Sequence, residues 1–362
     1  MSLPAAVPTF DLSDYTSCDT SLRASGIATL GGALGDIGFV VVEGHQIDAR
    51  LIRDVYALWQ SFFALDEPAK RRYAGIEGGA RGYTPFGVEH AKDNSTPDLK
   101  EFWHVGQELP PDHPLAHEYP PNVWPRELPE LRQPTLALYH ELERVAELLL
   151  MALAEHFALP EETFAAMMRG GNSVLRILHY PPVPPMAPVP PMAPAPPTAP
   201  VQQMPPVLPT SPSREGPPGP QAAVAAPEGP AGAAPALRAA PHEDINLVTL
   251  LCEATDSGLE LLRRDGAWLP VEARPGQLVV DAGDMLSRVT NQVVRATTHR
   301  VVNPPPGANR DRYSMPFFVH PYPACDLSVL ERFVSAERPC RFPPVTAGEL
   351  LSRRLTEIGL KR

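Results

Sequence analysis

The sequence has 362 residues, 43% of them hydrophobic and 20% charged, so it is long enough for two average domains or one large one. A formal net charge of −11 and a pI near 5.5 argue against a nucleic-acid partner. No signal-peptide pattern or long uncharged apolar run suggests a membrane partner, and the four cysteines follow no CxxC spacing. We therefore expect a protein of a reducing compartment, by default cytoplasmic.

The first part of the chain predicts helices around one strand. Residues 22–34 have a weak helical pattern and lead into the β-branched run at 39–42. Asp48 can cap a following helix, whose apolar residues recur at i, i+3 and i+4. Residues 75–125 are rich in Gly, Pro and aromatic residues and predict loops with short strands, before the apolar rhythm returns in a long helix over 134–159.

Beyond residue 172 the pattern changes to short β-rich segments separated by turn residues, which is typical of an antiparallel all-β region. The predicted strands are 174–180, 245–251, 258–263, 277–280, 293–302 and 312–319. Thr346 and Glu349 can form a capping box that opens a final helix to about residue 358. The sequence thus predicts helices, then a β-barrel or sandwich, then a helix.

A tract rich in Pro, Ala and Gly separates the first two of these strands. Residues 181–240 hold 21 of the 47 prolines, and the hexapeptide VPPMAP occurs twice in tandem. Such a composition cannot bury enough apolar surface to offset the entropy of ordering, so we expect a disordered spacer. The alternative is a polyproline II ligand for a protein partner of SH3 type. Whether the tract is a hinge or an insertion depends on the residues at its two ends.

Two residues that can bind a metal follow the tract directly. His242 and Asp244 open the predicted strand 245–251, and residues i and i+2 of a strand point to the same face. His299, on a later strand, adds a second imidazole. Two His and one carboxylate form the facial triad of non-haem Fe(II) oxygenases, which leaves three coordination positions open. An HxD pair alone is a weak signal and needs support.

Cationic and hydroxyl groups on two other strands supply this support. Arg312 and Ser314 face together, and an Arg fork beside a hydroxyl suits a carboxylate bound end-on. By the same rule Arg176 and Tyr180 share one face of the strand 174–180, so Tyr180 can add a hydroxyl to that carboxylate and Arg176 a second cation. Taken alone, an Arg at the start of a strand usually makes a surface ion pair.

Five segments carry a combination of motifs in a fixed order. They are LRILHYPP (175–182), HED (242–244), GDMLSRVTN (283–291), THRVVNP (298–304) and RYSMPFF (312–318). Together they resemble the isopenicillin N synthase-like family of Fe(II)/2-oxoglutarate-dependent oxygenases. The strand at 39–42, the helix after it and GYTPFG (82–87) match as well, so the resemblance covers nearly the whole chain except the proline tract.

The resemblance implies a mainly β fold, a double-stranded β-helix (jelly-roll) core with helices packed outside. It implies O2 as oxidant, Fe(II) bound by His242, Asp244 and His299, and 2-oxoglutarate held as cosubstrate by Arg312, Ser314 and Tyr180. Two features depart from the family pattern. Leu178 stands where plant members have Asn, and Arg310 is a rival anchor two residues before Arg312. We favour Arg312 because Ser314 completes its pair.

On this basis we expect a dioxygenase that hydroxylates a small organic substrate and releases succinate and CO2. Candidates to line the substrate pocket are Arg176, Glu101, His104 and Phe318. Because Tyr180 before the tract and His242 after it are needed in one pocket, residues 181–240 are expected to be an insertion within one catalytic domain. The predicted organisation is an N-terminal α/β region (1–170), an interrupted β-helix core (171–345) and a C-terminal helix (346–362).

Three alternatives stay open from the sequence. An ethylene- and succinate-forming enzyme would oxidise 2-oxoglutarate itself, and Arg176 would then meet a carboxylate or guanidinium partner. An oxidase like isopenicillin N synthase would use no 2-oxoglutarate, and Arg312 with Ser314 would bind the substrate's own carboxylate. A silent metal-binding scaffold would keep the fold and use the proline tract for partners, although the triad and anchor pair together speak against it.

Overall fold

The structure describes residues on both sides of the predicted insertion. The computed structural model describes residues 6–75, 80–89, 97–183, 236–305 and 307–357. They belong to one unit made of Met1–Val183 and Ala236–Arg362, while a second unit, Pro184–Pro235, lies outside the described residues. Most of the predicted disordered insertion (181–240) therefore lies outside them as well.

Helices are concentrated in the first half of the described chain and strands in the second. The helices are α1 (Leu12–Tyr15), α2 (Thr20–Asp36), α3 (Ala49–Phe63), α4 (Glu67–Arg71), α5 (Arg132–His156), α6 (Glu162–Met168), α7 (Asp284–Val289) and α8 (Ala347–Glu357). The strands are β1 (Thr9–Asp11), β2 (Phe39–Glu43), β3 (Gly82–Thr84), β4 (Glu101–Gly106), β5 (Val174–Tyr180), β6 (Ala239–His242), β7 (Val248–Cys252), β8 (Leu259–Leu262), β9 (Trp268–Pro270), β10 (Leu278–Ala282), β11 (His299–Val301) and β12 (Arg312–Val319).

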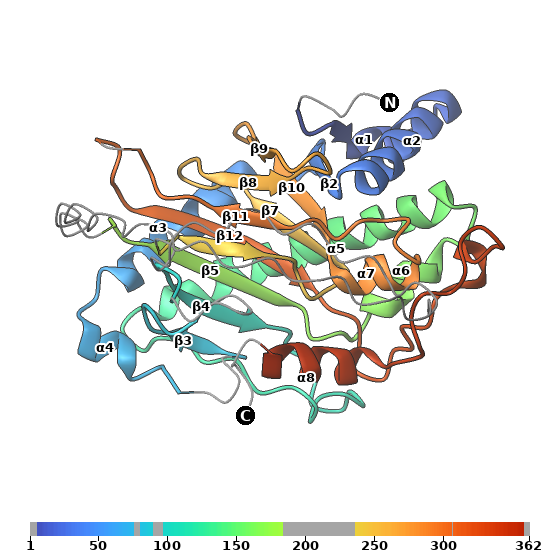
Figure 1. Cartoon of the computed structure of the whole chain (residues 1–362). Coiled ribbons are helices and arrows are strands. Elements are labelled where there is room, and N and C mark those ends of the chain that lie inside the picture. Colours follow the sequence, from blue (N-terminus) through green and yellow to red (C-terminus); the bar gives the residue numbers. More distant parts are fainter. Residues whose placement is uncertain (1–5, 76–79, 90–96, 184–235, 306, 358–362) are drawn as a thin grey trace, which may run out of the picture. The chain divides into compact units, whose positions relative to one another are not determined.

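The strands form two sheets (Figure 1). The larger has eight strands in the order β1-β2-β10-β7-β12-β5-β4-β3, and the smaller has four in the order β6-β11-β8-β9. All neighbouring strands are antiparallel except β1 and β2, which are parallel. The strands before and after the predicted insertion, β5 and β6, lie in different sheets of the same unit.

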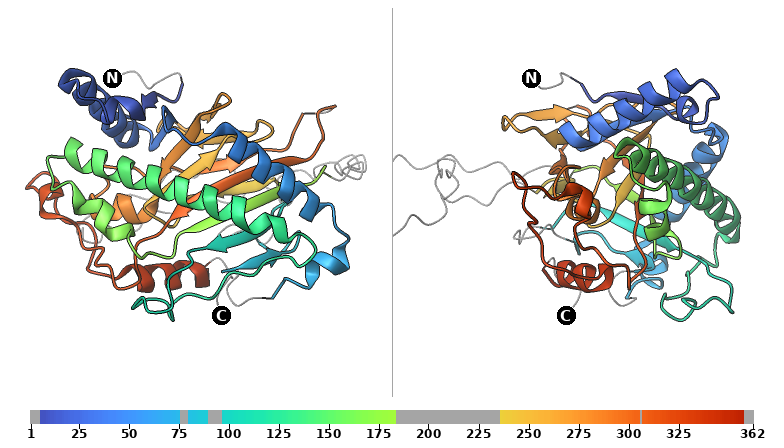
Figure 2. Two further views of the ribbon diagram at one scale, coloured as in Figure 1. Left: turned by 180° about the vertical axis from the view of Figure 1, so that it is seen from behind. Right: turned by 90° about the vertical axis from the view of Figure 1, so that its right-hand side faces the viewer.

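The larger sheet is covered differently on its two faces. Helices α3 and α5 lie across one face (Figure 2), and Trp59 and Leu150 pack there with sheet residues such as Val280. On the other face Val279 of β10 packs with Leu261 of the smaller sheet. Alternate residues of a strand point to opposite faces. Successive residues of β10 therefore pack in turn against the helices and against the smaller sheet.

Several predicted elements are confirmed. β5 and β12 have the predicted bounds of 174–180 and 312–319. The Asp48 side chain caps α3 by accepting from the Arg50 backbone N–H. Thr346 and Glu349 exchange the two hydrogen bonds of a capping box, at 3.0 and 3.3 Å, at the start of α8.

Other predicted strands are wrong in their bounds. The strand expected over 245–251 begins only at Val248, and of the expected strand 293–302 only His299–Val301 is β structure. The short helices α6 and α7 follow no long apolar rhythm and were not expected. Periodicity fails here because neighbouring segments, rather than local preference, fix the backbone of these short stretches.

The ends of the predicted insertion are tied to neighbouring loops. The Val183 backbone exchanges hydrogen bonds of 2.7 and 2.8 Å with the Asn309 side chain. On the far side the Leu99 N–H donates to the Leu237 carbonyl at 3.0 Å, and β6 begins at Ala239. Residues 236–240, which the composition assigns to the tract, therefore belong to the described structure, and β6 begins among them.

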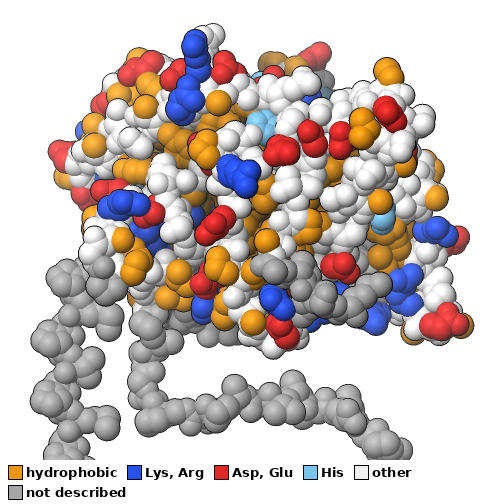
Figure 3. Space-filling model, turned by 90° about the horizontal axis from the view of Figure 1, so that it is seen from above, with side chains coloured by type: hydrophobic (Ala, Val, Ile, Leu, Met, Phe, Trp, Pro, Cys, Tyr) orange, Lys and Arg blue, Asp and Glu red, His pale blue; other side chains and the backbone are white. Residues whose placement is uncertain are grey.

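The surface mixes charges of both signs. On the face seen in Figure 3, acidic and basic side chains alternate over most of the coloured surface, with apolar side chains between them. Among the described residues, no helix has both the length and the apolar character needed to span a bilayer.

Candidate active site

A pocket lies between the inner face of the larger sheet and the strands β6, β8 and β11 of the smaller one. Its lining includes eight residues singled out from the sequence, namely Tyr180, Arg176, His242, Asp244, His299, Arg312, Ser314 and Phe318. Segments on both sides of the predicted insertion thus contribute to one cavity.

The three predicted metal ligands lie together in this pocket. His242, Asp244 and His299 each offer one ligand atom, and these atoms lie within 4.8 Å of one another. Asp244 Oδ1 is 3.7 Å from His242 Nε2 and 3.8 Å from His299 Nε2. The predicted grouping is correct, but its stated reason is wrong, since His242 ends β6 and Asp244 lies in the following loop. His299 is opposite His242 in the β6–β11 register.

Backbone carbonyls orient the two imidazoles. His242 Nδ1 contacts the Ala240 carbonyl at 2.7 Å, and His299 Nδ1 contacts the Thr297 carbonyl at 3.1 Å. A carbonyl only accepts, so Nδ1 carries the proton in each ring and the Nε2 lone pair faces Asp244. Burial and the neighbouring His242 lower the pKa of His299 to about 4, which keeps its ring neutral near neutral pH. Two Nε2 donors and one carboxylate oxygen fit Fe(II).

The carboxylate of Asp244 is held by residues that were not singled out from the sequence. The Thr249 hydroxyl donates to Asp244 Oδ2 and accepts from Asn246 Nδ2 at 2.8 Å. The Asp284 N–H, at the start of α7, donates to the Asp244 carbonyl at 2.8 Å. A Cβ on Gly283 would lie 2.3 Å from the Asn246 carbonyl oxygen, so only glycine permits this approach. The GDMLSRVTN motif therefore supports the loop that carries Asp244.

Arg312 lies at one side of the pocket with two hydroxyl-bearing neighbours. Its side chain is buried, and Nε donates to the carbonyls of Asp256 and Ser257 at 3.1 and 3.2 Å. Nη1 lies 3.3 Å from Ser314 Oγ, and the guanidinium stands 5.0 Å from the centre of the Tyr180 ring. The fork is thus fixed from behind, and the predicted trio of Arg312, Ser314 and Tyr180 lies together.

The rival anchor Arg310 points elsewhere. It is exposed and forms an ion pair with the Asp256 carboxylate at 2.9 Å. A second buried guanidinium near Arg312, that of Arg238, was not expected. Burial and the charge of Arg312 lower the pKa of Arg238. In the described ranges neither Arg238 nor Arg312 makes an ion pair with a carboxylate, so the buried Arg312 fork in the pocket lining has no directly paired anion there.

Arg176 and Phe318 line the pocket as predicted. The Arg176 guanidinium lies 5.1 Å from the Phe318 ring centre and 4.1 Å from that of Phe102. Its Nε lies 2.6 Å from His104 Nε2. His104 thus contacts the pocket wall through Arg176 and does not itself line the cavity.

Lys100 also lines the pocket and was not predicted to do so. Its Nζ lies 2.8 Å from carboxylate oxygens of both Glu89 and Asp98. Glu89 lies 3.2 Å from Arg176 as well. Burial raises the pKa of Glu89, but Arg176 and Lys100 outweigh it and hold that pKa well below its ordinary value. The cluster is therefore ionised and internally paired.

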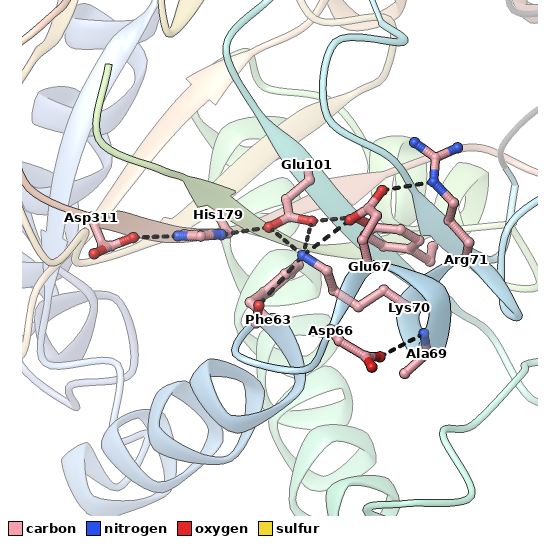
Figure 4. Close-up of polar contacts among 10 residues, drawn as sticks. Phe63, Asp66, Glu67, Ala69, Lys70, Arg71, Glu101, His179 and Asp311 are labelled. Atoms are coloured by element: carbon pink, nitrogen blue, oxygen red, sulfur yellow. Dashed lines mark hydrogen bonds and ion pairs between the residues drawn. The ribbon is translucent and has the colours of Figure 1, made fainter. Parts of the chain in front are cut away.

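The prediction that Glu101 lines the pocket is wrong. On β4, Glu101 alternates with Phe102 and points to the helix-covered face of the sheet. There its carboxylate accepts from Lys70 Nζ at 2.8 Å and contacts His179 at 2.7 Å (Figure 4). The two-residue period of a strand shows which residues share a face, but not whether that face is turned to the pocket or to the helices. For β4 the face that carries Glu101 is turned to the helices.

Asp281 of β10 is a further carboxyl group in the pocket lining. Burial and the charge of Asp244 raise its pKa well above the ordinary value. Nothing in the sequence points to it beyond the presence of an acidic residue within an otherwise apolar strand.

Comparison with known proteins agrees with this geometry. Residues 7–127 match the family model described as the non-haem dioxygenase in morphine synthesis N-terminal, and residues 217–321 match that of the 2OG-Fe(II) oxygenase superfamily. A solved 2OG-Fe(II) oxygenase family protein from Caulobacter crescentus is 37% identical, with 98% of this chain and 100% of that chain covered and a TM-score of 0.77. The chain belongs to the 2OG-Fe(II) oxygenase superfamily.

Two further relatives of this oxygenase differ in what they support. A 2-oxoglutarate-Fe(II) type oxidoreductase of Aspergillus fumigatus is 27% identical over 362 residues, which cover 97% of this chain and 93% of that protein. A full-length protein of Neurospora crassa, solved in complex with alpha-KG, is 22% identical with a TM-score of 0.75 and 98% of each chain covered, and supports the fold alone.

The superfamily assignment confirms several predictions. The protein is an Fe(II)- and 2-oxoglutarate-dependent dioxygenase, with O2 as the oxidant and a small organic molecule as the substrate. The relatives do not favour the ethylene-forming, oxidase or silent-scaffold alternatives.

Proposed function

We propose that this dioxygenase binds Fe(II) through His242, Asp244 and His299 and holds the far carboxylate of 2-oxoglutarate with Arg312, Ser314 and Tyr180. The observation that carries the proposal is that the candidate metal ligands and the candidate carboxylate anchors line one pocket. The imidazole Nε2 atoms are turned toward Asp244, and the Arg312 fork lies beside Ser314. When bound, Fe(II) couples decarboxylation of 2-oxoglutarate by O2, which yields succinate and CO2, to oxidation of a substrate C–H bond.

The charge around Arg312 supports the cosubstrate role. A buried guanidinium is costly unless an anion compensates it, and within the described chain no carboxylate pairs with Arg312. Its Nε is already used by two carbonyls, so the Nη atoms are the donors left for a bidentate contact. The hydroxyls of Ser314 and Tyr180 can then donate to the same carboxylate.

Other residues of the pocket lining suit the substrate. Phe318 and Leu178 offer apolar contact, while Arg176 and Lys100 offer N–H donors whose charges are already balanced by Glu89 and Asp98. A wall of this kind fits a small organic molecule with an apolar part and a hydrogen-bond acceptor. We infer hydroxylation as the outcome.

The two sheets fit the halves of a double-stranded β-helix. They enclose the pocket between them, and helices lie outside the larger sheet (Figures 1 and 2). On this view residues 171–345 form the catalytic core, 1–170 pack against it, and the segment between β5 and β6 is an insertion. Loop-closure entropy rises by only about 0.6 kcal/mol per doubling of length, so a core can tolerate such an insertion.

Succinate release tests the proposal. Purified protein with Fe(II), O2 and 2-oxoglutarate is expected to form succinate, while Asp244→Ala and His299→Ala do not, although both variants keep the wild-type circular dichroism spectrum. Succinate formation that persists in either variant would contradict the assignment of the metal ligands.

A further inference from the structure

The face of β5 that is turned away from the pocket carries a buried histidine. Tyr180 lines the pocket, so the adjacent His179 points to the opposite side of the sheet. In the antiparallel register His179 lies opposite Glu101 of β4 and Tyr313 of β12. Lys70 of α4 reaches the same row from the helical layer (Figure 4).

Both ring nitrogens of His179 contact carboxylates. Nδ1 lies 2.7 Å from Glu101 Oε1, and Nε2 lies 2.7 Å from Asp311 Oδ1 (Figure 4). A neutral imidazole has one N–H, so its other nitrogen would direct a lone pair at a carboxylate oxygen. Both contacts are satisfied only when His179 is an imidazolium that donates twice. The Tyr313 ring stacks on it at 4.6 Å with an interplanar angle of 11°, and an aromatic face favours a cation.

The groups around His179 carry charges of both signs. The titratable groups that face it or its partners are Glu101 (β4), Lys70 and Glu67 (α4), Tyr83 (β3), Tyr313 (β12) and Asp311 just before β12. Burial raises the pKa of Glu101, but contacts with His179, Lys70 and Tyr83 outweigh it and lower that pKa. Since Lys70 already balances Glu101, the charge of His179 is the one that balances Asp311.

Asp311 stands directly before the proposed cosubstrate anchor. The next residue, Arg312, is paired with Tyr180 in the β5–β12 register, and Asp311 is bound to His179, the neighbour of Tyr180. The contact between His179 and Asp311 therefore fastens β5 to β12 one residue away from that pair. The Asp311 side chain is 51% exposed, so without this contact it can turn to water and release the start of β12.

We propose that His179 is a positioning residue for the cosubstrate. As an imidazolium held between Glu101 and Asp311, it fixes the relative position of Arg312 and Tyr180 that binds the far carboxylate of 2-oxoglutarate. The inference rests on the proposed role of Arg312. It predicts that affinity for 2-oxoglutarate falls when either carboxylate contact of His179 is removed, although His179 never touches the cosubstrate.

Anaerobic titration of the Fe(II)-loaded protein with 2-oxoglutarate tests this inference. His179→Gln keeps a polar side chain but cannot donate to both carboxylates, and we expect it to raise Kd about threefold to thirtyfold. In turnover, KM for 2-oxoglutarate rises in the same ratio while succinate release at saturating 2-oxoglutarate stays close to the wild-type rate.

Two more variants keep the test decisive. Asp311→Asn removes the same charge pair from the exposed side and is expected to reproduce the effect even if His179→Gln folds poorly. His45→Gln is the matched control, because His45 is a buried histidine whose ring contacts the Gly276 carbonyl and the Ile47 N–H, away from the pocket lining, and it should leave Kd unchanged.

The outcomes separate the inference from the function it rests on. If wild-type protein, His179→Gln and Asp311→Asn bind 2-oxoglutarate with the same Kd, the positioning role is refuted and the cosubstrate assignment survives. If the Fe(II)-loaded wild type does not bind 2-oxoglutarate, the positioning role of His179 and the proposed binding of 2-oxoglutarate at Arg312 are both refuted.

Discussion

Thr249→Val removes the hydroxyl that holds Asp244 and changes little else. Valine has nearly the shape of threonine, and Thr249 is buried on β7, so packing is preserved. The change deletes the hydrogen bond to Asp244 Oδ2 and leaves Asn246 Nδ2 without its acceptor. Partners that orient a metal ligand typically contribute about 10- to 100-fold in metal affinity, or about 1.4 to 2.8 kcal/mol. We expect a loss of Fe(II) affinity in this range.

The assay is competition for Fe(II) with a chelator under anaerobic conditions, with thermal unfolding of the metal-free protein measured in parallel. An unsatisfied buried donor costs about 1 to 3 kcal/mol, so the metal-free variant also unfolds at a lower temperature. Thr249→Ser keeps the hydroxyl and serves as the control, with Fe(II) affinity close to the wild type. Unchanged Fe(II) affinity in Thr249→Val would refute the reasoning that Thr249 orients Asp244 for the metal.

Three further predictions follow from the pocket and the chain around it. Arg312→Lys keeps the charge but loses the fork, so KM for 2-oxoglutarate should rise about tenfold or more. Arg310 lies in an exposed ion pair, so Arg310→Lys should leave this KM unchanged. Equal effects of the two substitutions would contradict the choice of Arg312 as the anchor. Because burial and the charge of Asp244 disfavour the ionised form of Asp281, Asp281→Asn should keep Fe(II) affinity within about threefold of the wild type, and a large loss would mean that Asp281 acts as an anion at the metal site. Deleting residues 184–235 and joining the ends with a short Gly-Ser linker should preserve the melting temperature and Fe(II) binding, and loss of both would show that the segment is structural.

The sequence pointed to the proposed metal ligands by residue type and order rather than by local structure. His242, Asp244 and His299 are the expected residues, yet Asp244 lies in a loop where a strand was expected. The backbone of that loop is set by hydrogen bonds to the start of α7, including the one from the Asp284 N–H to the Asp244 carbonyl. Such contacts join segments about 40 residues apart, and no local pattern indicates them.

The residues that support the site were harder to predict than the site itself. Thr249, Asp281 and Lys100 are single polar residues in or beside apolar strands, and a sequence does not say whether such a residue faces a pocket or solvent. Glu101 shows the converse error, because its partners Lys70 and His179 come from elements that the linear pattern cannot bring together. Regular elements with their own signals, such as β5 and the capping box of α8, were predicted correctly.

Anaerobic addition of Fe(II) and then 2-oxoglutarate to the metal-free protein tests the proposed active site most directly. A visible charge-transfer band is expected when 2-oxoglutarate chelates the bound Fe(II), and it should be missing in Asp244→Ala and weakened in Arg312→Lys at the same 2-oxoglutarate concentration. A wild-type protein that shows no band at saturating 2-oxoglutarate, or an Asp244→Ala variant that shows the full band, would contradict the site described for this protein.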